Sequence, residues 1–182
     1  VTRFCAPGRG AVTALAAVTD AQLGILMALG YGPGDAIVTS SYPLFATAGC
    51  IARVGATPLF VDIEPATFNL SPAALADFLE NRCRQNGDGQ LVDDAGRVVR
   101  AIIPVHLFGL CCEIDPIREI AARYGLTVIE DAAQAIGAED PATAGAPQAG
   151  PVTASGWFRF CPSDTPGPAS APAALVPAYP TP

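Results

Sequence analysis

Residues 126–135, which read Leu-Thr-Val-Ile-Glu-Asp-Ala-Ala-Gln-Ala, decide the fold class of this 182-residue chain. The first five residues form a short apolar run, which is typical of a strand buried on both faces of a sheet. The segment before it, from Asp115-Pro116 to Gly125, has apolar residues at helical spacing and a glycine at its end. Because a helix leads directly into a buried strand, we expect a parallel sheet covered by helices.

The same alternation continues towards the amino terminus. Predicted strands occupy residues 36–39, 57–61 and 100–105, and predicted helices occupy residues 20–29, 44–54 and a third segment that begins at Ser71-Pro72. Thr19 and Ser71 are the expected N-caps of the first and third of these helices. Asn86-Gly87-Asp88-Gly89 predicts a hairpin turn. The sequence therefore predicts an α/β fold whose mostly parallel sheet carries helices on both faces.

The chain changes character after Asp140. Residues 1–140 form the predicted α/β domain, whereas residues 141–182 contain ten of the 18 prolines and only two charged side chains, Arg159 and Asp164. Proline removes a main-chain donor and interrupts both helices and central strands. We expect a poorly ordered, Pro/Ala-rich tail without regular structure apart from the aromatic patch Trp157–Phe160, and hence an unfinished fold.

Composition excludes several function classes. Ten basic and 17 acidic residues give a net charge of −7, which argues against nucleic acid or an anionic membrane as the partner. All ten basic residues are arginine, so the chain holds no lysine for a Schiff base, a phosphate-binding loop or proton transfer. A single histidine, His106, is too few for a His-rich zinc site, and the six cysteines form no CxxC pair. We interpret the thiols as reduced and buried in a cytoplasmic protein without a metal site.

Asp131 is the first candidate site residue, because it directly follows a predicted parallel strand. Ligand-binding groups of such sheets lie just beyond the carboxyl ends of the strands. A carboxylate there can keep the ring nitrogen of a pyridoxal-type cofactor protonated, or it can simply cap a following helix. Spacing alone does not separate these two interpretations. Gln134 follows about one turn later.

Thr19 and His106 each allow a functional and a structural interpretation. At a helix start, Thr19 offers a hydroxyl beside free main-chain N–H groups and could cradle a phosphate, although most threonine caps bind nothing. His106 follows a predicted apolar strand, where a lone histidine more often supports the fold through hydrogen bonds than catalyses a reaction. A full GxGxxG fingerprint is absent around Gly8-Arg9-Gly10, which disfavours a plain nucleotide-binding module.

Three segments, residues 24–70, 101–109 (AIIPVHLFG) and 125–139 (GLTVIEDAAQAIGAE), resemble the DegT/DnrJ/StrS family of sugar aminotransferases. The resemblance implies an incomplete large domain of a fold-type I enzyme that depends on pyridoxal 5'-phosphate. It also implies transfer of an amino group from glutamate or glutamine to a keto-sugar, usually nucleotide-linked, in polysaccharide or antibiotic biosynthesis. Family members are homodimers, so a second copy of the chain is the implied partner.

The site residues of the family carry over to four positions of this chain. Asp131 is similar to the partner of the pyridine nitrogen, and Gln134 is similar to the group near the phenolic oxygen of the cofactor. Thr19 resembles the threonine of the phosphate-binding turn. His106 matches a histidine in a supporting position.

Four other site positions depart from the family pattern. Val18 replaces the glycine of the phosphate-binding turn, and Leu44 stands where an aromatic residue stacks on the cofactor ring. Residues 156–164 resemble the segment GWFSFFPSK, with Arg159 in place of a phosphate-binding serine and Asp164 in place of the Schiff-base lysine.

Without an amine at position 164, the resemblance implies a chain with no catalytic residue of its own. The alternative is a truncated or frame-shifted, non-catalytic product that at most binds the cofactor or dimerises. Val1, which stands where an initiator methionine is expected, also suggests a fragment.

Overall fold

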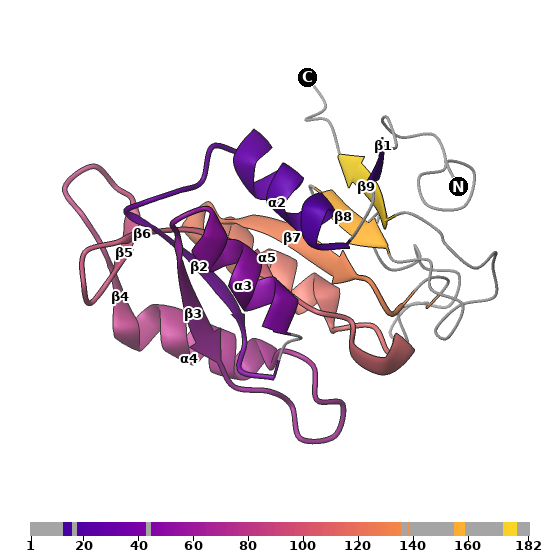
Figure 1. Ribbon diagram of the computed structural model, residues 1–182. Helices are drawn as coiled ribbons and strands as arrows, with labels where there is room; N and C mark the ends of the chain where they lie inside the picture. The colour runs from indigo at the N-terminus through magenta and orange to yellow at the C-terminus, as the bar shows by residue number, and fades with distance from the viewer. Residues whose placement is uncertain are drawn as a thin grey trace.

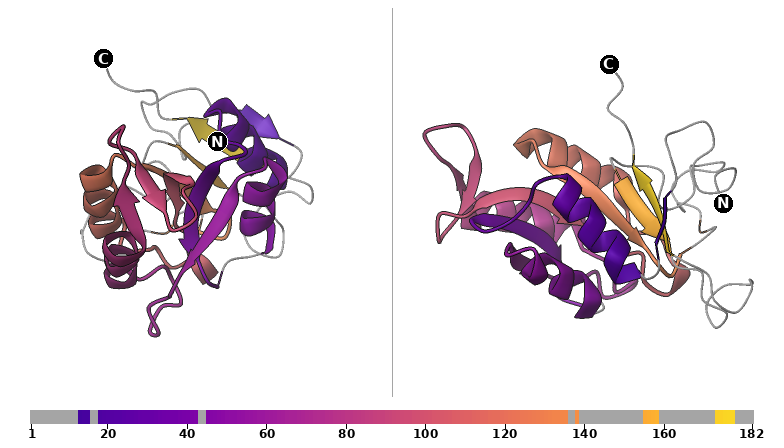
Figure 2. Two further views of the ribbon diagram at one scale, coloured as in Figure 1. Left: turned by 90° about the vertical axis from the view of Figure 1, so that its left-hand side faces the viewer. Right: turned by 45° about the horizontal axis from the view of Figure 1, so that its top comes forward.

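The computed structural model describes residues 13–15, 18–42, 45–135, 138, 155–158 and 173–177. A single sheet runs through the centre, and helices pack against both of its faces (Figure 1). The same three layers can be followed from two other directions in Figure 2. A short hairpin projects from one end of the sheet and ends in the predicted Asn86-Gly87-Asp88-Gly89 turn.

The main path of the sheet has the strand order β1-β9-β8-β7-β6-β2-β3. Every neighbouring pair on this path is parallel except those that involve β9, which runs antiparallel to both β1 and β8. The prediction of a mostly parallel sheet is therefore confirmed. The bounds of these strands are β1 Thr13–Leu15, β2 Asp35–Ser40, β3 Thr57–Val61, β6 Val98–Ile103, β7 Thr127–Ala132, β8 Ser155–Phe158 and β9 Ala173–Pro177.

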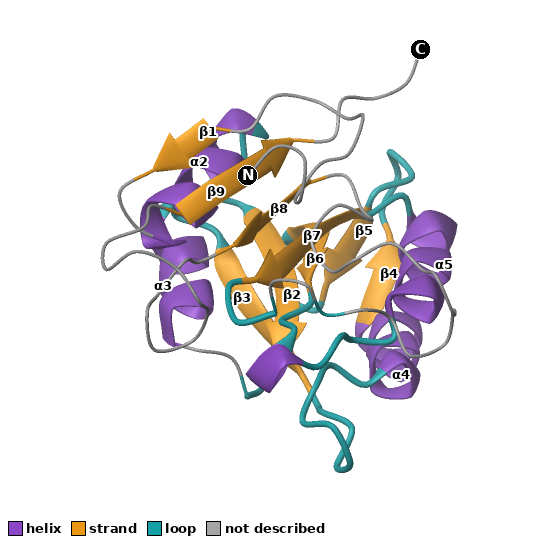
Figure 3. Ribbon diagram, turned by 90° about the vertical axis from the view of Figure 1, so that its right-hand side faces the viewer, coloured by secondary structure: helices purple, strands orange, loops and turns teal. Residues whose placement is uncertain are grey.

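Helices cover both faces of the sheet, as the sequence predicts. One face carries α2 (Val18–Ala28) and α3 (Phe45–Arg53), and the other carries α4 (Pro72–Arg82) and α5 (Ile114–Tyr124) (Figure 3). Successive residues of a strand point to opposite faces, which divides the core into two clusters. Ile129 of β7 packs with residues of α2 and α3, whereas its neighbour Val128 packs with residues of α4 and α5.

Most predicted boundaries agree with the structure within two residues. Ser71 caps α4 as expected, because its Oγ accepts a 3.4 Å hydrogen bond from the Ala74 N–H. Gly125 ends α5 with φ at 67°, a left-handed conformation that favours glycine. The predicted hairpin is formed by β4 (Cys83–Gln85) and β5 (Leu91–Asp93), which pair antiparallel.

Two helices begin one or two residues earlier than the sequence predicts. Helix α2 begins at Val18, so Thr19 lies inside the first turn and is not the N-cap. Helix α5 begins at Ile114, one residue before the predicted Asp115. Shifts of one or two residues are common at helix ends.

The region after Asp140 contributes two strands. β8 overlaps the aromatic patch for which we expected regular structure, and it lies inside the sheet between β7 and β9. β9 was not expected; its only proline, Pro177, is the last residue of the strand, where the lost main-chain donor interrupts the ladder least. The remaining residues of 141–182 lie outside the described part, so the poorly ordered tail and the domain boundary stay predictions.

Within the described ranges, none of the helices combines the length and the apolar character needed to cross a membrane.

Candidate functional site

Asp131 lies near the carboxyl end of β7 and is almost wholly buried, at 1% exposure. Its main chain is fixed to the segment that follows β6: the Asp131 N–H donates to the Pro104 carbonyl at 2.9 Å, and the His106 N–H donates to the Asp131 carbonyl at 2.9 Å. The position of this residue is therefore set by parallel pairing between β6 and β7, as the sequence predicts for a group at the strand ends.

Three donors among the described residues reach the carboxylate of Asp131. Nε2 of Gln22 donates to Oδ2 at 3.0 Å, and Oγ1 of Thr47 donates to the same oxygen at 2.9 Å. The Ala133 N–H donates to Oδ1 at 3.2 Å. Two helices and one strand, far apart in the sequence, thus meet at one buried carboxylate.

The helix-cap interpretation of Asp131 is not what the structure shows. Asp131 belongs to β7 itself, and the following described residues, up to Ala135, form a turn without a helix. Its contact with Ala133 is a local side-chain turn of the kind that aspartate commonly makes. The carboxylate is instead directed at α2 and α3.

Thr19 lies one helical turn before Gln22 on α2, so the two side chains share a face of the helix. Since Gln22 touches Asp131, the structure brings Thr19 close to the same end of the sheet. The carbonyl of Thr19 accepts a 3.6 Å hydrogen bond from Sγ of Cys50 on α3. Burial raises the pKa of the Cys50 thiol to about 11, so this thiol is neutral at physiological pH.

His106 has the supporting role that we expected. Its ring is buried, Nε2 lies 3.1 Å from Oε2 of Glu130, and Nδ1 accepts the Cys112 N–H at 2.9 Å. Because Nδ1 accepts a hydrogen bond, Nε2 is the ring nitrogen that carries the proton towards Glu130.

Gln134 is half-buried and follows Asp131 in the turn after β7. Its Oε1 accepts a 3.4 Å hydrogen bond from the N–H of Phe108, in the single 3-10 turn Leu107–Gly109 that follows His106. Phe108 has φ at 54°, an unfavourable conformation for a residue with a large side chain. Gln134 therefore borders the same loop cluster as Asp131 and His106.

Three of the predicted site positions cannot be placed. Leu44, Arg159 and Asp164 all lie outside the described residues. Phe45, which follows Leu44, is the first residue of α3 and is 90% exposed.

Gln22, Thr47 and Asn69 are buried polar residues that the sequence reasoning missed. Asn69 holds the loop after β6, since its Oδ1 accepts the Leu107 N–H and its Nδ2 donates to the Leu110 carbonyl, both at 3.0 Å. A detectable signal existed for Gln22, which sits beside buried Ala21 and Ile25 on the apolar side of α2. A polar residue on such a stripe needs a partner.

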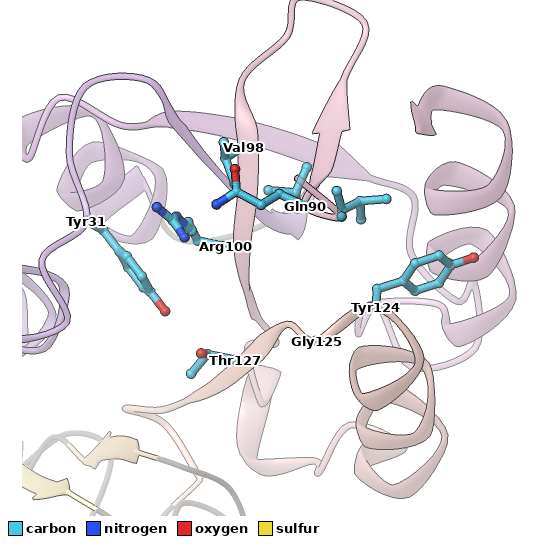
Figure 4. Close-up of a pocket in the computed structure, with 10 residues that line it drawn as sticks. Tyr31, Gln90, Val98, Arg100, Tyr124, Gly125 and Thr127 are labelled. Carbon is cyan, nitrogen blue, oxygen red and sulfur yellow. The ribbon is translucent and has the colours of Figure 1, made fainter. Parts of the chain in front are cut away.

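A cavity of about 300 Å³ among the described residues lies away from the candidate site. It is lined by Val98 and Arg100 at the start of β6, by Thr127 at the start of β7, and by Tyr31 and Tyr124 on opposite sides (Figure 4). It therefore lies at the amino ends of the strands, whereas Asp131 lies at their carboxyl ends. The described part of the chain also holds no cluster of His, Cys, Asp or Glu that could bind a metal ion.

A sequence model of the DegT/DnrJ/EryC1/StrS aminotransferase family matches residues 3–163. A pleiotropic regulatory protein of Geobacillus stearothermophilus is 47% identical over 114 residues, which cover 63% of this chain and 26% of that protein. A UDP-2-acetamido-2-deoxy-3-oxo-D-glucuronate aminotransferase of Pseudomonas aeruginosa is 43% identical over 120 residues, which cover 66% of this chain and 29% of that protein. The chain thus spans less than a third of the length of these relatives.

Solved structures share the fold. S. venezuelae DesV, in complex with a ketimine intermediate, matches with a TM-score of 0.79 at 28% identity, over 98% of this chain and 42% of DesV. A DegT DnrJ EryC1 StrS aminotransferase from Brucella abortus matches with a TM-score of 0.73 at 34% identity, over 93% of this chain and 42% of that one. A Bacillus subtilis protein, ntda, solved with bound cofactor PMP, matches with a TM-score of 0.74 at 29% identity, over 93% and 34%. The fold is that of a fold-type I aminotransferase large domain, and it is incomplete.

Proposed function

Because this chain belongs to the DegT/DnrJ/EryC1/StrS aminotransferase family, we propose that it serves the pyridoxal-phosphate-dependent transfer of an amino group from glutamate or glutamine to a nucleotide-linked keto-sugar. Two relatives support this substrate class by their names, the UDP-sugar aminotransferase of Pseudomonas aeruginosa and a GDP-perosamine synthase of Caulobacter vibrioides, 42% identical over 113 residues. We place the reaction in the cytoplasm, in polysaccharide or antibiotic sugar biosynthesis, with a homodimer as the working unit.

The observation that carries the proposal is the buried carboxylate of Asp131 at the carboxyl end of β7. Pyridoxal phosphate, when bound, supplies an electron sink whose strength depends on a protonated ring nitrogen. A carboxylate fixed by three hydrogen-bond donors is suited to hold a proton on that nitrogen, because its negative charge stays in place.

The residues present fit non-covalent binding of this cofactor. Oε1 of Gln22 is buried beside Asp131 and has no hydrogen-bond partner among the described residues, as is typical of a site that a ligand completes. Thr19, in the first turn of α2, offers a hydroxyl and main-chain N–H groups to the phosphate. Gln134 lies three residues after Asp131 in the sequence and borders the loop after β6.

The sequence has no lysine, so no side chain of this polypeptide provides the amine for covalent attachment. We therefore propose that the chain binds the cofactor only non-covalently and does not complete amino transfer by itself. The alternative is a truncated or frame-shifted product. Reading the gene in the other two frames after residue 140 tests it: recovery of the family segment GWFSFFPSK supports a frame shift, and its absence from both frames excludes one.

Cofactor binding is tested by titrating the purified chain with pyridoxamine phosphate, which has no aldehyde and so reports non-covalent binding alone. We expect saturable binding to the wild-type chain and at least a tenfold weaker affinity for Asp131→Ala, about 1.4 kcal/mol. Asp88→Ala, in the exposed hairpin turn, is the matched control and should bind as the wild type does. Equal affinities of Asp131→Ala and wild type would overturn the assignment of Asp131.

A second experiment tests whether the cofactor attaches covalently to the chain. After incubation with pyridoxal phosphate and borohydride, peptide mapping should find no reduced adduct on any side chain. An adduct on a side chain of this chain would overturn the proposal that it binds the cofactor without a covalent bond.

A further inference from the structure

We propose that Gln22 and Thr47 are positioning residues that hold the Asp131 carboxylate ionised and aimed at the ring nitrogen of the cofactor. This inference rests on the function proposed above and extends it to two residues on separate helices. Neither of them was a candidate from the sequence.

Both residues act on the same oxygen. Nε2 of Gln22 and Oγ1 of Thr47 reach Oδ2 of Asp131 at 3.0 and 2.9 Å, so this oxygen accepts one donor from α2 and one from α3. The Ala133 N–H holds Oδ1 from the strand side. A carboxylate that accepts hydrogen bonds from these three donors cannot rotate about its Cβ–Cγ bond without breaking one of them. Its orientation is therefore fixed before any ligand binds.

Burial makes these donors necessary. The side chains of Gln22, Thr47 and Asp131 are at most 2% exposed. Removing a carboxylate from water favours its protonated form, which is neutral and would not attract a protonated ring nitrogen by charge. Hydrogen bonds donated to the ionised form act in the opposite direction. Gln22 and Thr47 therefore favour the negative charge of Asp131 that the ring nitrogen requires.

Gln22 has features that packing alone does not explain. It is buried beside Ala21 and Ile25 on a helix face that otherwise contributes to the apolar core, and its Oε1 is left without a partner among the described residues. A buried acceptor without a partner is destabilising, whereas an apolar side chain of similar volume would avoid that cost. The amide is explained if its N–H groups are needed at Asp131.

Two other titratable groups, Cys50 and Glu130, can be placed relative to this carboxylate. On α3 the thiol of Cys50 senses the charges of Arg53, Asp131 and Asp20, the last of which lies on α2. Glu130 points to the opposite face of β7, towards His106. Since burial raises the pKa of Cys50 to about 11, the thiol stays neutral wherever a carboxylate titrates.

The first test needs no cofactor. The side-chain carboxyl of Asp131 is followed by carbon-13 NMR against pH in the full chain carrying Thr47→Val, Gln22→Met or Thr47→Ser. Valine and methionine keep the volume and remove the donor, whereas serine keeps the hydroxyl. We expect the titration midpoint of Asp131 to rise by about one pH unit, a tenfold change in proton affinity, in the first two variants and to stay at the wild-type value in Thr47→Ser. Unchanged midpoints in Thr47→Val and Gln22→Met would overturn the inference.

The second test compares pyridoxamine phosphate with its 1-deaza analogue, in which a C–H group replaces the ring nitrogen. The wild-type chain should prefer the natural ring at least tenfold, and both donor-deleting variants should lose most of this preference while binding the analogue as before. Equal losses for the two ligands would show a purely structural role and would contradict the inference. If the wild-type chain binds neither ligand, the proposed function fails, and the NMR titration still decides what Gln22 and Thr47 do to Asp131.

Discussion

Nε2 of His106 lies 3.1 Å from Oε2 of Glu130, on the face of β7 opposite to the side chain of Asp131. Both members of this pair are at most 1% exposed. Two consecutive acidic residues of one strand therefore point to different faces of the sheet and have different partners: Glu130 meets His106 on the side of α5, and Asp131 meets α2 and α3. The structure uses one of them to support the loop after β6 and presents the other at the candidate site.

Replacement of His106 by leucine should destabilise the fold strongly. It removes the imidazole beside the buried Glu130 carboxylate and the acceptor of the Cys112 N–H. Removing the Nε2–H donor from a buried carboxylate and the Nδ1 acceptor from a buried N–H costs about 1–3 kcal/mol for each group. The measurement is the free energy of unfolding from urea denaturation, with Glu130→Gln as a milder variant that keeps a hydrogen bond to the ring.

The matched control for this prediction is the exposed pair Arg82–Asp94, whose Nε and Oδ2 are 3.0 Å apart with both side chains 66% exposed. Asp94→Asn should change the free energy of unfolding by less than about 1 kcal/mol, because solvent screens exposed pairs. Similar effects of His106→Leu and Asp94→Asn would show that the buried pair adds nothing to stability.

The positions of Asp131 and His106 could be predicted because they depend on local order. Asp131 lies near the end of an apolar strand and His106 follows another, and parallel strands end at one edge of a sheet. The partners of Asp131 could not, because Gln22 and Thr47 reach it from 109 and 84 residues away in the sequence. Which residues of two helices meet at a strand end depends on packing that no local pattern encodes. Strand β9 was not predicted because the region around it is rich in proline, although the strand itself has a single proline at its last position.

Gly55→Ala should destabilise the chain more than Gly125→Ala. Both glycines have positive φ, 86° and 67°, where an L-residue costs about 1–2 kcal/mol. A Cβ on Gly55 would also lie 2.9 Å from Cγ of Pro33, a ring that cannot swing aside, whereas nothing lies within 4 Å of a Cβ on Gly125. We expect about 1 kcal/mol or more of additional loss for Gly55→Ala from overpacking.

Urea denaturation of the two variants side by side measures this difference. Gly125→Ala is the control for backbone strain without a clash. If the two variants unfold at the same urea concentration, Pro33 moves freely and the close approach of Gly55 has no energetic consequence.

Asp93 should make stability depend on acidic pH. Burial raises the pKa of Asp93, but hydrogen bonds from the side chain and main chain of Arg97 and from the Ala95 N–H lower it more, so the net pKa lies below its ordinary value. A carboxyl whose pKa is lowered on folding stabilises the fold above its unfolded pKa, and this contribution disappears as the pH falls through the folded pKa. Asp93→Asn should therefore cost about 1–2 kcal/mol at pH 7 and progressively less below about pH 4.

The readout for Asp93 is the difference in free energy of unfolding between wild type and Asp93→Asn, measured from pH 7 down to the acid limit of folding. Asp88→Asn, in the neighbouring exposed turn, should show no such convergence. The burial of Asp93 is a finding of the structure, in which its carboxylate pairs with Arg97. A constant difference at all pH values would contradict the role of Arg97.

Cys50 should be nearly unreactive in the folded chain. Burial raises the pKa of its thiol to about 11, and thiolate is the nucleophilic form, so at pH 8 the thiolate fraction falls about a hundredfold below that of a thiol with a pKa near 9. Cys83 distinguishes the effect of the pKa on the labelling rate from the effect of solvent access. Burial raises the pKa of Cys83 to about 11 as well, but its side chain is only half-buried. Alkylation with iodoacetamide, followed by peptide mass mapping, should give slow labelling of Cys83, slower labelling of Cys50 and equal rates in urea. Rapid labelling of Cys50 in the folded chain would mean that α2 and α3 open at the very place where Gln22 and Thr47 hold Asp131.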